Sequence, residues 1–200
     1  MIETYITTKN YSELLSACEE YELKYGTLTD PSFSLYDLYP AYLGSYIIAD
    51  DLNSARFLRK RMLGKAKLQG CAISTETDQM WQVCVALWKR NYKDAYILLN
   101  DTSRWSIQIQ PMISDILESI RERMATLLSK AYSTLTMDDV IDYFGMQEAD
   151  ITQALLTKGW SYDTNTKIFT TRKPDVSQRE SSNFGQLSAI ADMVLHLEKF

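Results

Sequence analysis

The stretch AYSTLTMDDVIDYFGM, residues 131–146, contains the beginning, the apolar face and the end of one short helix. Thr136 is a favourable N-cap residue, and Asp138 and Asp139 place negative charge in the first turn, where the helix dipole stabilises it. Three apolar residues form the buried face: Val140, Ile141 and Phe144. Gly145 is expected to end the helix, because glycine is the residue most often found just past a helix C-terminus.

The residues after this helix predict a second helix and a β-hairpin. The second helix runs roughly from Gln147 to Lys158, and the segment WSYDTNTKIFTT, residues 160–171, has two short arms joined by polar turn residues. Helix, helix and hairpin form the second half of a winged helix, so residues 131–172 are predicted to be such a unit. Its candidate partner-binding residues are Trp160, Tyr162 and Ile168.

Winged helices often bind DNA, but the charge of this unit disfavours that function. In a DNA-reading winged helix the second helix enters the major groove and usually carries Arg, Lys or Asn. Here it carries Glu148 and Asp150 against Lys158 alone, and the whole chain has a net charge of −5, which weakens attraction to phosphate. A nucleic-acid binder is therefore the more remote alternative, and it would use three cations near the hairpin: Lys167, Arg172 and Lys173.

The first part of the chain, residues 1–130, contains a short repeated phrase. KNYSEL, DDLNSA and RNYKDA each place a large apolar residue three positions before a smaller apolar one: Tyr11 and Leu14, Leu52 and Ala55, Tyr92 and Ala95. The first members are 41 and then 40 residues apart. A period near 40 is typical of stacked helical hairpins, in which each hairpin covers the apolar face of the next. An irregular helical domain is the alternative, and both interpretations predict a mainly α fold.

A longer helix is predicted to join the repeats to the winged helix. Pro111 fits its first turn, because proline lacks only an N–H group that would be unpaired there. Apolar residues then recur at helical spacing: Ile113, Ile116, Leu117, Ile120, Met124, Leu127 and Leu128.

The end of the chain is predicted to be a polar linker, residues 173–182, followed by a helix over residues 183–200. The apolar residues of this helix cover an arc of roughly 200°, about twice what a helix docked on its own domain needs. Such a helix either joins a bundle with partner helices or folds back on its own chain. Its candidate partner-binding residues are Phe184, Leu187, Ile190, Val194 and Leu197.

No catalytic, cofactor or metal motif is recognisable in the sequence. The only histidine, His196, lies on the polar side of the predicted terminal helix, and the three cysteines form no Cys-x-x-Cys pair. No small-molecule substrate is indicated, and neither a secretory signal nor a membrane-spanning run is present. These observations predict a non-catalytic interaction protein of the cytoplasm or nucleus.

Three segments, in order and spacing, resemble the COP9 signalosome subunit 8 family of PCI-domain proteins: DDLNSARFLRKRM, LLSKAYSTLTMDDVIDYFGM and MVLHLEKF. The resemblance covers most of the chain, and residues 127–146 are its most specific part. It implies a PCI domain, in which TPR-like helical repeats are capped by a winged helix and followed by a C-terminal helix.

The resemblance also implies a function. The family's members are non-catalytic scaffold subunits of the complex that removes the ubiquitin-like protein NEDD8 from the cullins of cullin-RING ubiquitin ligases. Its isopeptidase is a different, zinc-binding subunit. The implied partners are other COP9 signalosome subunits, which pack their winged helices edge to edge and join their C-terminal helices in one bundle. PCI subunits of the proteasome lid or of translation initiation factor 3 are the alternatives, since they share this architecture.

Overall fold

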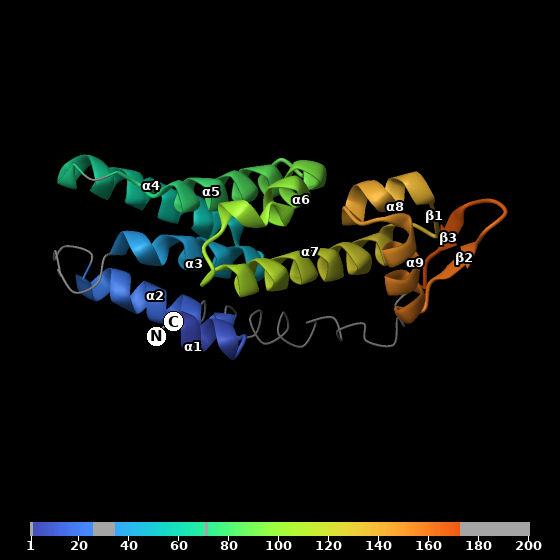
Figure 1. Cartoon of the computed structure of the whole chain (residues 1–200), viewed down its shortest axis with the longest axis horizontal. Helices are drawn as coiled ribbons and strands as arrows, with labels where there is room; N and C mark the ends of the chain where they lie inside the picture. The colour runs from blue at the N-terminus through green and yellow to red at the C-terminus, as the bar shows by residue number, and fades with distance from the viewer. Residues whose placement is uncertain (1, 26–34, 71, 173–200) are drawn as a thin grey trace, which may run out of the picture.

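The computed structural model describes residues 2–25, 35–70 and 72–172, and within them the chain is mainly helical, as predicted (Figure 1). The first part of the chain forms these elements: α1 (Ile2–Thr7), α2 (Tyr11–Tyr25), α3 (Leu35–Ile48), α4 (Leu52–Gln69), α5 (Thr75–Trp88), α6 (Tyr92–Asn100), the 3-10 helix η1 (Thr102–Arg104) and α7 (Gln110–Ala131). The remaining elements form what we call the C-terminal unit, residues 132–172: β1 (Thr134–Thr136), α8 (Met137–Phe144), α9 (Glu148–Thr157), β2 (Ser161–Asp163) and β3 (Ile168–Thr170).

The three repeated phrases of the sequence are three turns of the same geometry. Each begins with a residue in the left-handed conformation, at φ angles of 54°, 60° and 57°: Lys9, Asp50 and Arg90. The next residue donates its backbone N–H to the carbonyl five positions earlier, and its side chain caps the following helix: Asn10, Asp51 and Asn91. This paired arrangement is a Schellman turn leading directly into an N-cap. The predicted period of about 40 residues is thus a period of helix-to-helix turns.

Removing one of these caps is expected to weaken the repeat in a pH-dependent way. Asp51 Oδ1 accepts the Ser54 backbone N–H at 3.0 Å, and the Ser54 hydroxyl donates to Asp51 Oδ2 at 2.6 Å. These hydrogen bonds lower the pKa of Asp51 in the folded chain. A carboxylate with a lowered pKa stabilises the fold above its unfolded pKa of about 3.9, and the effect is lost as the pH falls through the folded value.

Asp51→Ala should therefore lower the free energy of unfolding by about 1 kcal/mol at neutral pH, and by less near pH 3. Urea denaturation at both pH values measures the difference. Asn53→Ala, at an exposed position of the same turn, is the control and should change little. An equal cost of Asp51→Ala at both pH values would contradict this role of the carboxylate.

Helix α3 lies in the middle of the repeat stack and packs against α2, α4, α5 and α7. Figure 1 shows α3 and α7 between a layer of α1 and α2 and a layer of α4, α5 and α6. The central position of α3 follows from its sequence, because the segment from residue 38 to residue 48 has no charged side chain. Five of the apolar side chains in this segment are almost fully buried: Tyr39, Ala41, Tyr42, Leu43 and Ile47.

Helix α7 passes through two separate hydrophobic cores, as expected of the helix that was predicted to join the repeats to the next unit. Its first half contributes to the core of the repeat stack through Met112, Ile113, Ile116 and Ile120. Its second half contributes to the core of the C-terminal unit through Met124, Ala125 and Leu128. Pro111 occupies the first turn, as predicted. Leu127 was also predicted among the regularly spaced apolar residues of this helix. It is instead 57% exposed, because its neighbour Leu128 is the one that packs into the core.

The C-terminal unit contains the predicted order of helix, helix and hairpin. The Thr136 hydroxyl accepts the Asp139 backbone N–H, and Gly145 ends α8 with a φ of 59°, so both predicted ends of this helix are confirmed. The sequence did not predict strand β1, which precedes α8 and turns the hairpin into a three-stranded antiparallel sheet with the order β1-β3-β2. Phe169 of the central strand β3 is fully buried between Leu135 and Tyr162.

The predicted linker, residues 173–182, and the predicted terminal helix, residues 183–200, lie outside the residues that the structure describes.

Candidate protein-interaction site

The C-terminal unit is attached to the repeat stack by a close contact between α6 and the turn after α8. The Tyr96 side chain lies directly against Gly145, so that a Cβ atom added there would come within 2.8 Å of three Tyr96 atoms. Real Cβ atoms essentially never approach other atoms so closely. Gly145 therefore has two functions, because it adopts a left-handed φ and also leaves room for the Tyr96 ring.

Hydrogen bonds complete this contact, which we call the joint. The Tyr96 hydroxyl donates to the Tyr143 carbonyl at 3.0 Å, and Arg121 Nε of α7 donates to the Phe144 carbonyl at 3.2 Å. Both carbonyls belong to the last turn of α8, where backbone acceptors lack partners within the helix. The Arg121 guanidinium also lies 5.6 Å from the centre of the Tyr96 ring. Burial raises the pKa of Tyr96 to about 12, so the hydroxyl remains a donor at physiological pH.

An ion pair outside the joint adds a further link between the two parts. Lys93 Nζ of α6 lies 2.7 Å from Asp142 Oδ1 of α8. Both side chains are more than half exposed, so this pair contributes at most about 1 kcal/mol. The orientation of the C-terminal unit is therefore fixed mainly by Tyr96, Gly145 and Arg121, whose contacts are at least partly buried.

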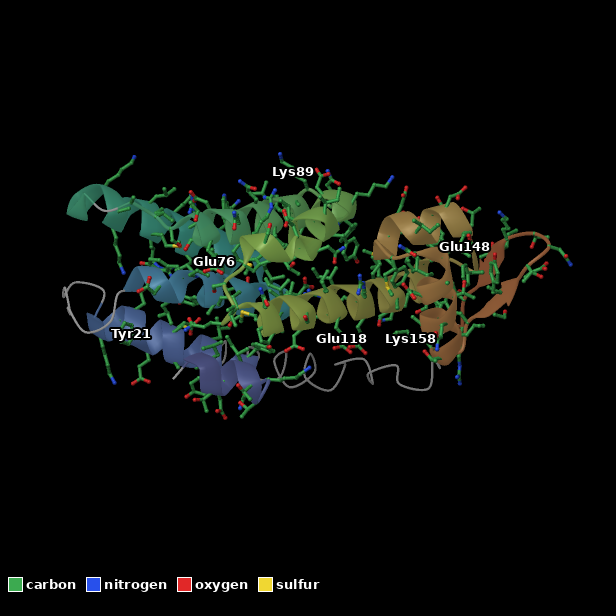
Figure 2. All side chains as sticks on the ribbon, in the orientation of Figure 1. Tyr21, Glu76, Lys89, Glu118, Glu148 and Lys158 are labelled. Carbon is green, nitrogen blue, oxygen red and sulfur yellow. The ribbon has the colours of Figure 1, made fainter. Side chains whose placement is uncertain are left out.

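One face of helix α9 lies on the outer surface of the C-terminal unit. This face is slightly hollowed and is lined by Glu148, Ala149, Thr152, Gln153 and Leu156. Leu156 is 49% exposed there. Figure 2 labels Glu148 at the beginning of α9 and Lys158 just past its end, so the acidic and basic groups lie at opposite ends. A face with an acidic beginning, an uncharged middle and an exposed leucine resembles a protein-binding surface more than one that contacts phosphates.

The sheet of the C-terminal unit ends in strand β2. Because β3 lies in the centre of the sheet, β2 has one edge that β3 does not cover. In the described part of the chain, no backbone hydrogen bond joins β2 to a segment other than β3. An open strand edge can pair with a strand of another protein.

The three hairpin residues predicted to bind a partner lie at different depths. Trp160 is buried in the core of the C-terminal unit at 5% exposure, whereas Tyr162 and Ile168 are half-buried. The Tyr162 ring packs on Phe169, with ring centres 4.6 Å apart. Only Tyr162 and Ile168 therefore offer side-chain surface to a partner directly, and the partner-binding role of all three stays a prediction.

The five terminal-helix residues, Phe184, Leu187, Ile190, Val194 and Leu197, lie outside the described residues. Sequence reasoning identified Gly145 as a helix end but did not find the joint, since nothing in the phrase RNYKDAY indicates that Tyr96 faces a turn 47 residues later.

The described residues contain no group of three or more His, Cys, Asp or Glu side chains placed to hold a metal ion. Burial raises the pKa of both Cys18 and Cys84 to about 12, which keeps these thiols protonated and poorly nucleophilic. No helix among the described residues is both long and apolar enough to cross a membrane.

Comparisons with known proteins agree with the architecture. A model of the CSN8/PSMD8/EIF3K family matches residues 34–180. Three relatives are each named COP9 signalosome complex subunit 8. The Xenopus tropicalis protein is 28% identical over 191 residues, covering 94% of both chains. The Arabidopsis thaliana protein is 26% identical over 195 residues, covering 96% of this chain and 95% of its own. The Dictyostelium discoideum protein is 27% identical over 206 residues, covering 99% and 96%.

The family match spans well over half of the chain, and the likeness to the signalosome subunits extends over nearly all of it. The residues matched by the family model include the second and third repeat turns and the C-terminal unit. The chain belongs to the CSN8/PSMD8/EIF3K family.

Proposed function

We propose that this chain is a non-catalytic scaffold subunit of the COP9 signalosome, and that it acts in the cytoplasm and nucleus. In this role it supports assembly of the complex that removes NEDD8 from the cullins of cullin-RING ubiquitin ligases. The proposal is supported by relatives of nearly equal length that are named as subunit 8 of that complex. The isopeptidase chemistry belongs, in this proposal, to a different subunit.

One structural observation supports the scaffold role most directly: the C-terminal unit is held at one end of the repeat stack by the joint. Figure 1 shows strands β2 and β3 at the end of the molecule farthest from α1 to α5. Among the described residues, the repeats therefore cover neither the open edge of β2 nor the outer face of α9. A fixed orientation matters for a scaffold, because each subunit must set the direction of the next one.

In the proposed assembly, a neighbouring PCI subunit packs against the C-terminal unit edge to edge. Backbone hydrogen bonds along β2 would provide affinity, and Tyr162 and Leu156 would provide apolar contact area. The terminal helix would join helices of other subunits in a bundle, with Leu187, Ile190, Val194 and Leu197 at 3-4-3 spacing along the seam.

Val194→Asp is expected to remove the chain from the complex while the described domain remains folded. A charge placed in the seam of a helix bundle is strongly unfavourable, because it loses water without gaining a partner. The measurement is affinity purification of the tagged full chain from cells in which it replaces the native copy, followed by identification of the co-purified subunits. His196→Asp, which adds the same charge on the predicted polar side, is the control and should leave assembly unchanged.

Different outcomes of this purification separate the alternatives. Full recovery of the signalosome by Val194→Asp would contradict the role of the terminal helix. If the unmodified chain instead co-purified with subunits of the proteasome lid or of translation initiation factor 3, it would belong to that complex and not to the signalosome. A salt-dependent gel shift of purified protein with DNA or RNA, lost on changing Lys167 and Arg172 to Glu, would support nucleic-acid binding instead.

A further inference from the structure

Helix α4 is strongly basic, although the whole chain has a net charge of −5. It contains six cationic side chains and no acidic one: Arg56, Arg59, Lys60, Arg61, Lys65 and Lys67. Three of them form ion pairs within the repeat stack. Arg59 pairs with Asp78 of α5 at 2.5 Å, while Arg61 and Lys65 both pair with Glu22 of α2, at 2.8 and 3.1 Å. These three cations therefore have a structural role in joining α4 to its neighbours.

The other three cations of α4 are exposed, and no described carboxylate lies within ion-pair distance of them. Together with the exposed Leu63, they occupy positions separated by four, three and four residues: Arg56, Lys60, Leu63 and Lys67. This spacing places all four on one side of the helix. The stripe is about 16 Å long, because each residue of a helix advances about 1.5 Å. We call these four residues the α4 basic stripe.

Two exposed aromatic rings border one end of the stripe. Phe57 is 50% exposed and Trp88, at the end of α5, is 49% exposed, although the other three tryptophans are buried or half-buried. The Arg56 guanidinium lies 5.4 Å from the centre of the Phe57 ring and 5.3 Å from that of Trp88. Lys60 Nζ lies 5.8 Å from the Phe57 ring. Lys89 follows Trp88, and Figure 2 shows it on the outer side of the α4–α5 layer, pointing away from the molecule.

We propose that the α4 basic stripe and its two rings bind an extended acidic segment of a partner protein, one that carries at least one large apolar side chain. The stripe supplies three cations without carboxylate partners, which an acidic segment would neutralise. Its length of about 16 Å matches roughly five residues of extended chain. Phe57 and Trp88 supply apolar area at one end, where an apolar side chain of the segment would be sheltered from water.

Charge and geometry favour an acidic protein segment over a nucleic acid at this surface. Arg56 already lies over a face of both rings, so a base that stacked there would have to displace it. A nucleic acid also brings one charge per nucleotide along its whole length, and beyond the stripe it would meet a protein of net charge −5. A short acidic segment can be as short as the α4 basic stripe, so its negative charges need not extend beyond the cations.

The surface lies on α4 and at the end of α5, whereas the proposed assembly role uses β2, α9 and the terminal helix, so this inference is independent of that role. It is tested by fluorescence anisotropy of the purified full chain with a labelled octapeptide of glutamate and leucine, and in parallel with a short labelled poly(U) RNA. Saturable binding of the peptide that weakens with salt is expected. Arg56→Glu/Lys60→Glu should weaken it at least tenfold.

Lys167→Glu/Arg172→Glu is the matched control, because it makes the same charge change at the hairpin and should leave peptide binding unaltered. Lys60→Ala/Lys67→Ala removes two positive charges without adding negative ones. It therefore tests the stripe even if Arg56→Glu/Lys60→Glu folds poorly. Val194→Asp should bind the peptide normally. Absence of peptide binding, equal binding by the stripe variants, or tighter binding of RNA that the stripe variants abolish would each overturn the proposal.

Discussion

Replacing Gly145 by alanine is expected to lower the free energy of unfolding by about 2 to 5 kcal/mol. The left-handed φ of 59° costs a residue with a Cβ atom about 1 to 2 kcal/mol. The new methyl group would also overlap the Tyr96 side chain, and such overpacking typically costs about 1 to 3 kcal/mol. Tyr96 cannot move away easily, because it is buried and its hydroxyl donates to the Tyr143 carbonyl.

Gly70→Ala provides a control that isolates the backbone contribution. Gly70 ends α4 with a φ of 64°, but apart from its chain neighbours no described residue has an atom within 4 Å of a Cβ atom added there. Its substitution should therefore cost only the conformational part, about 1 to 2 kcal/mol. Urea denaturation of both variants measures the difference. In a Tyr96→Ala background the further cost of Gly145→Ala should fall to the Gly70→Ala value, and equal costs of the two glycine substitutions in the native background would contradict the joint.

The features that the sequence predicted well are local ones. The Thr136 cap, the Gly145 end and the repeated phrases that begin at Lys9, Asp50 and Arg90 depend on residues within a few positions of each other. Their energetics can therefore be derived from neighbouring side chains and backbone groups alone. The regular spacing of these phrases predicted the helical stack, because hairpins of equal length bury their faces in the same way.

The features that the sequence did not predict depend on contacts between distant residues. Strand β1 has only three residues, and its pairing with β3 is fixed by the fold of the whole C-terminal unit. The contact of Tyr96 with the turn after α8 also depends on distant residues, since Tyr96 and Tyr143 are 47 residues apart in the sequence. The burial of adjacent apolar residues could not be predicted for another reason. Leu127 and Leu128 are 100° apart on the helix, and periodicity does not determine which one faces the core.

Phe169→Ala is expected to cost about 3 to 5 kcal/mol and to unfold the C-terminal unit in preference to the repeats. Phe169 is fully buried in the central strand, and its removal leaves a cavity between Leu135 and Tyr162 that a three-stranded sheet cannot easily close. The buried residues of this unit form a core distinct from that of the repeat stack. The lost stability should therefore appear first in the C-terminal unit.

Hydrogen exchange followed by mass spectrometry can resolve this difference, because protection of backbone amides reports the stability of each region separately. In Phe169→Ala, peptides from residues 132–172 should exchange much faster, whereas peptides from α3 should remain protected. Phe57→Ala removes the same side chain from a position that is 50% exposed, so it should cost well under half as much and leave both regions protected. An equal loss of protection in α3 and in the C-terminal unit would show that the joint and α7 couple the two cores into one cooperative unit. In that case the C-terminal unit could not reorient on the repeats without unfolding both.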